Sequence, residues 1–179
     1  MIIKIIAIVN TDGVEMPCDI SISGEAWASK NFRWRELADR STLTLKYCPQ
    51  LLDIAQWVRS NTGWLVDTTQ GLSWYRTKET NERIGGVPNS RHTRGLAFDC
   101  KCWVDYVGGE QVHPIHVAYK FQEAFRVHSL KGGIGTYMPL YNGSSGGYNH
   151  IDIRSEDILY VCHTINELKS IKYLSDIKL

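Results

Sequence analysis

Two segments of this sequence alternate ionisable and apolar residues, and this pattern requires β-strands that carry polar groups on one face. In residues 96–102 every even position is leucine, phenylalanine or cysteine, and Asp99 stands at an odd position. Further along the chain, His150, Asp152 and Arg154 alternate with two isoleucines. Because successive side chains of a strand point to opposite faces, each segment has one apolar face and one polar face. We therefore expect two strands whose apolar faces, cysteines included, point into the core.

The polar faces of these strands carry side chains that bind metal ions. Imidazole and carboxylate groups are ligands of zinc, and three protein ligands with one water make a catalytic zinc site. His92, Asp99 and His150 would supply such a set if the two strands converge. On spacing alone, a structural role for each histidine remains the alternative.

Length and charge exclude several classes of function. The chain has 179 residues, of which 43% are hydrophobic, and this predicts one domain with a substantial core. Its 20 Lys and Arg residues against 19 Asp and Glu residues give a formal net charge of +1. A near-neutral chain without a long basic run argues against nucleic-acid binding and against a polybasic membrane anchor, so we expect neither partner.

The cysteines and the first residues bear on where the chain is made. Its 5 cysteines are an odd number without CxxC spacing, so a disulfide framework is not expected. The apolar stretch 1–9 is too short to span a bilayer and is interrupted by Lys4, so we expect no signal peptide and synthesis in the cytoplasm. The oligomeric state is left open by the sequence.

Local patterns predict a hairpin and three helices. Residues 2–9 and 14–22 flank the turn-forming cluster Asn10–Gly13 and predict a β-hairpin, expected as an addition at a sheet edge. Apolar residues at helical spacing predict one helix that starts at Pro49 and ends before Gly63, and a second helix over about 114–128. Ser155 as an N-cap, followed by acidic residues, predicts a third helix over about 155–179.

The region around the metal-ligating residues resembles a known enzyme family. Ser90, His92, Gly95, Ala97 and Asp99, joined later by His150 and Asp152, fit the signature of the zinc D-Ala-D-Ala carboxypeptidase and L-alanyl-D-glutamate endopeptidase family. Tyr75-Arg76 with Asn81, the loop 85–90 and the segment 132–137 are similar to further elements of that family. The resemblance covers about 31–154 within the single domain 1–179, and leaves out the hairpin region 1–30 and the C-terminal segment.

The resemblance implies a fold and a set of site residues. It implies an α+β fold in which a small antiparallel sheet carries the zinc ligands and helices pack against it. His92, Asp99 and His150 would be the zinc ligands, and Asp152 either the general base or a group that orients a ligand histidine. Arg76 would bind a substrate carboxylate or carbonyl, with a surface salt bridge as the alternative. Ser90 would be a substrate-binding residue that hydrogen-bonds near the ligands. Tyr137 would be catalytic by donating to the oxyanion, with a packing role as the alternative.

The implied function is hydrolysis of a peptide bond in bacterial peptidoglycan. The substrate would be the stem peptide, cut either by D-alanyl-D-alanine carboxypeptidase or by stem-peptide endopeptidase activity. Together with the expected lack of a signal peptide, this favours a phage or prophage lytic enzyme that acts on the cell wall after release or as part of a phage particle. Other branches of the family place an acidic residue or histidine just before the last ligand, whereas here residues 146–149 are Gly-Gly-Tyr-Asn. That departure motivates one alternative, an inactive zinc-containing peptidoglycan-binding module, and a virion component is another.

Overall fold

The computed structural model describes residues 1–69, 74–138, 146–162 and 168–171. The chain forms two compact units, the first made of Met1–Gln56 and Thr68–Phe98 and the second of Trp57–Asp67 and Asp99–Leu179. Helix α2 (Pro49–Thr62) and strand β5 (Ala97–Trp103) each contribute residues to both units. The single domain expected from the sequence therefore stays a prediction.

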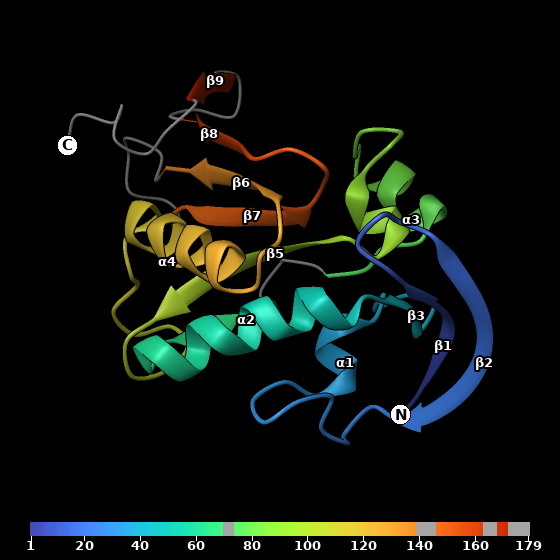
Figure 1. Ribbon diagram of the computed structural model, residues 1–179. Coiled ribbons are helices and arrows are strands. Elements are labelled where there is room, and N and C mark those ends of the chain that lie inside the picture. Colours follow the sequence, from blue (N-terminus) through green and yellow to red (C-terminus); the bar gives the residue numbers. More distant parts are fainter. Residues whose placement is uncertain (70–73, 139–145, 163–167, 172–179) are drawn as a thin grey trace. The chain divides into compact units, whose positions relative to one another are not determined.

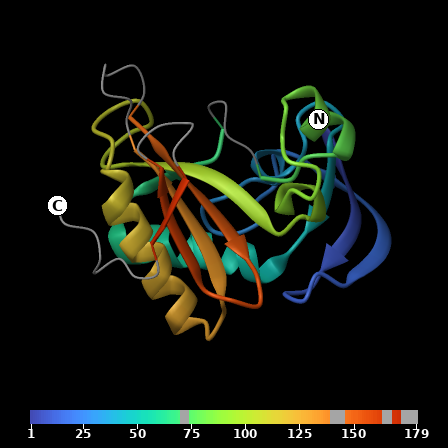
Figure 2. The ribbon, with the colours of Figure 1, turned by 90° about the horizontal axis from the view of Figure 1, so that it is seen from above.

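The first unit contains the predicted hairpin. Strands β1 (Ile2–Val9) and β2 (Glu15–Ser23) pair antiparallel, as Figures 1 and 2 show in blue. Asn10 closes the turn because its side-chain oxygen accepts the backbone N–H groups of Asp12 and Val14. Strand β3 (Thr44–Tyr47) pairs parallel to β1, so the sheet order is β2-β1-β3. The hairpin is thus built into a three-stranded sheet with β1 at its centre, so that of the two hairpin strands only β2 lies at an edge.

Short helices and an aromatic cluster complete the first unit. The helical segments are α1 (Trp34–Leu37), the first part of α2, α3 (Lys78–Arg83) and the 3-10 turn η1 (Arg91–Arg94). The buried ring of Trp74 stacks on Phe98 at 4.4 Å between centroids and meets Phe32 edge-on at 6.0 Å. Such aromatic pairs add to the stabilisation that burial of their large apolar surfaces provides.

The two helices predicted from apolar spacing are confirmed. Helix α2 begins at Pro49, where a missing N–H costs nothing, and ends before Gly63, which has a φ of 74°. Helix α4 (Pro114–Val127) begins with proline after His113, whose ring nitrogen accepts the backbone N–H of Ile115. No helix within the described ranges is long and apolar enough to cross a membrane.

A six-stranded sheet forms the centre of the second unit. Its strands are ordered β4 (Leu65–Asp67), β5, β7 (Tyr148–Ile153), β6 (Gly132–Tyr137), β8 (Ile158–Cys162) and β9 (Leu168–Ile171). Strands β4 and β5, β6 and β7, and β8 and β9 pair antiparallel, whereas β6 and β8 pair parallel. The α+β class is confirmed, and the sheet is mixed where a purely antiparallel one was expected.

Helix α4 covers one face of this sheet, against β6 and β7 (Figures 1 and 2). The buried amide of Asn149 in β7 donates to the carbonyl of Pro114 at 3.0 Å and to Thr136 Oγ1 at 3.2 Å. Ile151 shares this face with Asn149 by strand alternation, so β7 turns its apolar side to α4. His150 therefore points to the opposite face.

The helix predicted over about 155–179 is wrong where the structure describes that segment. Residues Ile158–Cys162 form β8 and Leu168–Ile171 form β9. The run Ile-Leu-Tyr-Val-Cys is apolar and rich in strand-forming residues, and its backbone pairs with β6 on one side and with β9 on the other. Residues 163–167 and 172–179 of the predicted helix lie outside the described residues.

Substitution of Gly95 tests a close approach that the turn before β5 requires. Gly95 has a φ of 73°, and a Cβ there would lie 2.4 Å from the carbonyl oxygen of Lys46. We expect Gly95→Ala to lower the free energy of unfolding by about 3 kcal/mol or more, from left-handed strain plus displacement of β3. Gly63→Ala is the matched control, since Gly63 has a φ of 74° but no atom within 4 Å of an added Cβ. Equal losses for the two variants in urea denaturation would show that the contact with Lys46 is not restrictive.

Candidate metal centre

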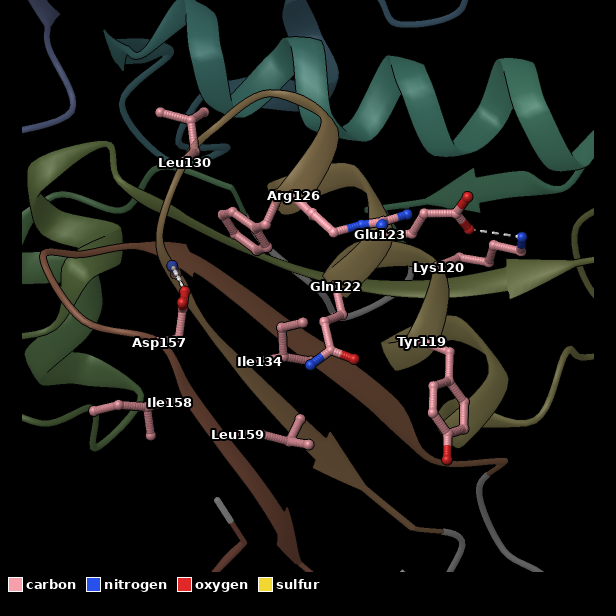
Figure 3. Close-up of a pocket in the computed structure, with 12 residues that line it drawn as sticks. Tyr119, Lys120, Gln122, Glu123, Arg126, Leu130, Ile134, Asp157, Ile158 and Leu159 are labelled. Atoms are coloured by element: carbon pink, nitrogen blue, oxygen red, sulfur yellow. Dashed lines mark hydrogen bonds and ion pairs between the residues drawn. The ribbon is translucent and has the colours of Figure 1, made fainter. Parts of the chain in front are cut away.

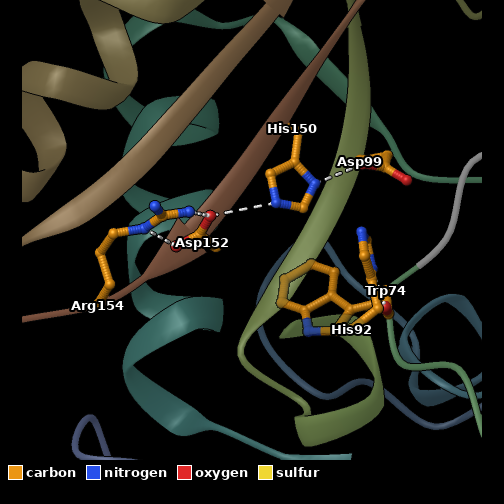
Figure 4. Close-up of polar contacts among 6 residues, drawn as sticks. All are labelled: Trp74, His92, Asp99, His150, Asp152 and Arg154. Atoms are coloured by element: carbon orange, nitrogen blue, oxygen red, sulfur yellow. Dashed lines mark hydrogen bonds and ion pairs between the residues drawn. The ribbon is translucent and has the colours of Figure 1, made fainter. Parts of the chain in front are cut away.

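Asp99 and His150 meet across neighbouring strands of the sheet. Strands β5 and β7 are adjacent, and the Nδ1 atom of His150 lies 2.9 Å from Oδ1 of Asp99 (Figure 4). The side chain of His150 is only 16% exposed, and that of Asp99 only 12%. Two donor atoms bound at about 2 Å to one tetrahedral zinc ion are about 3.3 Å apart, so this pair fits two ligands of a common zinc ion.

The other nitrogen of His150 faces a second carboxylate. Its Nε2 atom lies 3.2 Å from Oδ2 of Asp152, which is fully buried. Arg154 then donates from Nε to Oδ1 of Asp152 at 2.6 Å, and from Nη2 to Oδ2. Figure 4 shows the resulting row of side chains, Asp99, His150, Asp152 and Arg154. His150, Asp152 and Arg154 lie on one face of the strand, as the sequence alternation predicts.

The two carboxylates determine the protonation of His150 in the protein without metal. Burial alone lowers the pKa of His150, but the hydrogen bonds and negative charges of Asp152 and Asp99 outweigh it and raise the pKa to about 9. Burial raises the pKa of Asp152, yet His150 and Arg154 together hold it below its usual value. In this state His150 is a cation between two anions.

His92 belongs to η1, and both its ring and its backbone contact the segment Trp74–Arg76. Its buried ring has Nδ1 2.6 Å from the carbonyl oxygen of Trp74. A carbonyl only accepts, so Nδ1 carries the proton and the lone pair of the neutral ring is on Nε2. The backbone N–H of Arg76 donates to the His92 carbonyl at 3.3 Å. These contacts fix both the tautomer and the position of the ring.

His92, Asp99 and His150 form a candidate metal site, in which each residue offers one ligand atom. The sequence predicts the same three residues as zinc ligands, and their role as ligands stays a prediction. Two imidazoles and one carboxylate suit zinc and leave a fourth position for water or substrate. The chemistry of this donor set therefore fits a catalytic zinc ion.

The remaining predicted site residues lie in ordered surroundings. Ser90 is buried at the start of η1, and its carbonyl accepts the N–H and the hydroxyl of Thr93. Arg76 lines a cavity of about 200 Å³ in the first unit, together with residues of the segments 36–41 and 80–84. The ring of Tyr137 stacks on Tyr148 at 4.3 Å between centroids.

Tyr137 also lies on the metal-ligand side of the sheet. Its strand neighbour is Tyr148, and Gly135 stands opposite His150 in the same pairing. Because side chains of a strand alternate between faces, Tyr137, Tyr148 and His150 share one face. The stacked tyrosines are thus next to His150 along β7.

A larger cavity, of about 610 Å³, lies on the other side of the sheet. Figure 3 shows that α4 lines it together with β6, β8 and the residues before β8. It includes Ile134, on the face of β6 that α4 covers, and Asp157, whose carboxylate accepts the N–H of Gly132 at 3.1 Å. Neither Asp99 nor His150 lines it, so this cavity is separate from the metal ligands.

Comparison with known proteins identifies the family. The family model for Peptidase M15 matches residues 25–131, which is more than half of the chain. The chain belongs to the M15 peptidase family. No curated protein and no solved structure matches it.

The M15 match confirms the resemblance noted in the sequence and makes the chain a member of a family of zinc metallopeptidases. It includes Arg76, His92 and Asp99 but ends before β7. His150 is thus connected to the family's site by the structure, through its contact with Asp99.

Two residues of this M15 site were not predicted. Trp74 contacts His92 through its backbone carbonyl, which any residue would supply, so the residue type at position 74 does not predict this contact. Arg154 alternates with His150 and Asp152, and the sequence places it on their face, but its fork toward Asp152 follows only from the structure. A basic residue two positions after a buried acid on a strand is the signal that could have found it.

Asp39 stabilises the segment that carries Arg76, and its replacement should have a pH-dependent effect. The buried carboxylate accepts the backbone N–H groups of Ser41, Thr42 and Thr77. Burial raises the pKa of Asp39, but these hydrogen bonds, together with one from the Thr80 side chain, outweigh it and lower the pKa below 3.8. The ionised group therefore adds stability above that pH, and this contribution is lost as the pH falls through the pKa of the folded state.

We expect Asp39→Asn to lower the free energy of unfolding by about 1–3 kcal/mol at pH 7, because the amide is a weaker acceptor. The difference from the unmodified protein should narrow below pH 3.8. Urea denaturation at pH 7 and pH 3 measures both values. Asp19→Asn is the control, since Asp19 is 73% exposed in a pair with Lys4 and should change little. A difference that does not vary with pH would contradict the role given to the Asp39 charge.

Proposed function

We propose that this M15 protein is a zinc peptidase that hydrolyses a peptide bond in the stem peptide of bacterial peptidoglycan. The observation that carries the proposal is the donor set His92, Asp99 and His150 in a chain of this family. His150 and Asp99 already face each other in the fold, and the tautomer of His92 leaves the Nε2 lone pair for a metal.

The residues around the metal would have two kinds of role, as ligands and as a group that orients a ligand. A bound zinc ion supplies a Lewis acid and makes hydroxide available from water near neutral pH. His92 would bind it through Nε2, His150 through Nδ1 and Asp99 through its carboxylate. Asp152 would accept the Nε2–H group of His150, which orients the ring and makes the ligand more basic.

Of the two roles considered for Asp152, its surroundings support orientation. The side chain is fully buried, and both oxygens already accept hydrogen bonds from Arg154. A general base must reach the attacking water and take its proton. The guanidinium of Arg154 lowers the pKa of this carboxylate, which makes it a poor proton acceptor.

The substrate would be recognised by Arg76 and Tyr137. We propose that the Arg76 guanidinium binds a carboxylate or carbonyl of the stem peptide, which its planar fork suits. Tyr137, stacked on Tyr148 along the face that carries His150, would donate its hydroxyl to the developing oxyanion. Ser90 would contribute to substrate binding indirectly, because its hydrogen bonds to Thr93 fix η1 and therefore the position of His92.

The setting of the reaction is part of the proposal. The bond cut would be the terminal D-Ala-D-Ala bond or a bond within the stem peptide, and neither nucleic acid nor membrane takes part. We propose that the protein is made in the cytoplasm and reaches the cell wall after release or as part of a phage particle.

A second function is a zinc-containing module that binds peptidoglycan without cutting it. The observation in its favour is the segment before His150, where Gly146, Gly147, Tyr148 and Asn149 supply no carboxylate or imidazole. Asn149 is moreover on the opposite face of β7, bonded to Pro114. Zinc-loaded protein that binds peptidoglycan but releases nothing would favour this function.

Metal content and turnover test the first function together. We expect about one zinc ion per chain, and loss of most of it in His92→Ala and Asp99→Ala, because three ligands become two. Products released from purified peptidoglycan, identified by mass spectrometry, should disappear with a chelator and in both variants. His116→Ala is the control, as His116 is exposed and outside the donor set. Product release that persists without zinc would contradict the proposal.

Asp152→Asn separates orientation from base catalysis. If Asp152 orients His150, the amide variant should bind zinc about 10- to 100-fold more weakly, and saturating zinc should restore much of the turnover. Zinc affinity is measured by competition with a chelating dye, and turnover by product release at several zinc concentrations. Unchanged affinity with abolished turnover would instead assign the base role to Asp152.

A further inference from the structure

The carboxylate of Asp152 is held by the guanidinium group of Arg154. Arg154 approaches it with two nitrogen atoms, each donating to a different carboxylate oxygen. The backbone of Arg154 is itself fixed, since its N–H donates to the carbonyl of Lys131 at 3.2 Å. A two-point fork fixes the rotation of a carboxylate as well as its position.

Rotation of this carboxylate matters because Oδ2 has two partners. It accepts from Arg154 and lies 3.2 Å from Nε2 of His150. Turning the carboxylate would carry Oδ2 away from the imidazole, and the ring would lose the contact that directs Nδ1 at Asp99. The fork therefore acts on the imidazole through Asp152.

The strand beside β7 leaves room for the guanidinium. Gly133 pairs with Asp152 across the strands, and a Cβ added there would lie 2.5 Å from Nη2 of Arg154 and 2.6 Å from Oδ2 of Asp152. An alanine at this position would thus occupy the place where the fork meets the carboxylate. The end of an arginine side chain can move aside, so the substitution should displace Arg154 without breaking the sheet.

We infer that Arg154 and Gly133 are positioning residues of the metal centre: together they set the rotation of Asp152, and through it the orientation of the His150 ring toward its metal-binding position. This inference rests on the proposed zinc site, and it goes beyond that proposal by assigning two residues that touch neither metal nor substrate. Lysine cannot replace the arginine, because an ammonium is a single point of contact and does not define rotation.

The test combines zinc affinity with a spectroscopic signature of the ring. Arg154→Gln, Arg154→Lys and Gly133→Ala are compared in the full chain, with Zn²⁺ itself as the probe. We expect each to bind zinc about 10- to 100-fold more weakly than the unmodified protein. In the zinc-free proteins, the imidazole ¹⁵N resonances of His150, recorded by long-range ¹H–¹⁵N correlation, should shift in all three variants.

Two matched controls separate positioning from folding. Lys120→Gln removes a different basic partner, one that is 41% exposed in its pair with Glu123, and should leave zinc affinity and the His150 signals unchanged. Gly132→Ala places a Cβ 2.5 Å from the backbone oxygen of Asp152 and 2.2 Å from the Phe125 ring, so it should lower the unfolding midpoint far more than Gly133→Ala. Gly133→Ala keeps the test valid if the Arg154 variants do not fold.

The outcomes distinguish this inference from the function on which it rests. Folded Gly133→Ala and Arg154→Gln with unchanged zinc affinity and unchanged His150 resonances would overturn the inference. If the unmodified protein binds no zinc, the proposed function fails, and the His150 resonances of the zinc-free variants still decide whether Arg154 and Gly133 orient the ring. Weakened affinity with shifted resonances in the folded variants, and neither in Lys120→Gln, would support it.

Discussion

The placement of His150 between two buried carboxylates is the constraint on which the site depends. Ionised groups removed from water are costly unless they are paired and hydrogen-bonded. Here the charges alternate along the row Asp99, His150, Asp152 and Arg154, so a protonated His150 makes two anions and two cations. The cost of burial is offset inside the row, and removal of one member would take a compensating charge away from its neighbour. A metal ion that takes Nδ1 must displace its proton, and the carboxylates then serve the metal and the remaining N–H group.

The sheet of the second unit separates this charged row from the apolar core by strand alternation alone. Asn149 and Ile151 turn toward α4, while His150 and Asp152 turn away from it. The glycines of β6 follow from the same geometry. Gly132 faces α4 and admits the Phe125 ring, and Gly133 faces the charged row and admits the Arg154 guanidinium. One dipeptide therefore permits close packing on both faces of the sheet, which explains why glycine occurs inside a strand that it would otherwise weaken.

The parts of the structure that sequence could predict are those controlled by local periodicity. Alternation placed Asp99 and His150 on strand faces, and helical spacing with proline and glycine boundaries located α2 and α4. The helix prediction for the segment 158–162 failed because a five-residue apolar run has no distinctive period. Its strand conformation is determined by parallel pairing with β6, which is distant in sequence. Trp74 could not be recognised as the partner of His92, because a backbone carbonyl has no residue signature. The position of Arg154 two residues after Asp152 indicates that the two side chains pair, but the two-nitrogen fork follows only from the structure.

The two proposed functions, peptidase and peptidoglycan-binding module, differ in whether they need a proton acceptor near the metal. On β7, Tyr148 shares the face of His150 and stacks on Tyr137, while Asn149 is engaged on the other face. The preceding residues 139–147 contain no aspartate, glutamate or histidine either. Asp152 has the right chemistry but is committed to Arg154 and His150. A peptidase built on this strand must therefore take its base from another segment or rely on the acidity of a metal-bound water, whereas a binding module needs neither. The ligand set alone is compatible with both, so it is the proton transfer, and not the metal, that distinguishes catalysis from binding in this protein.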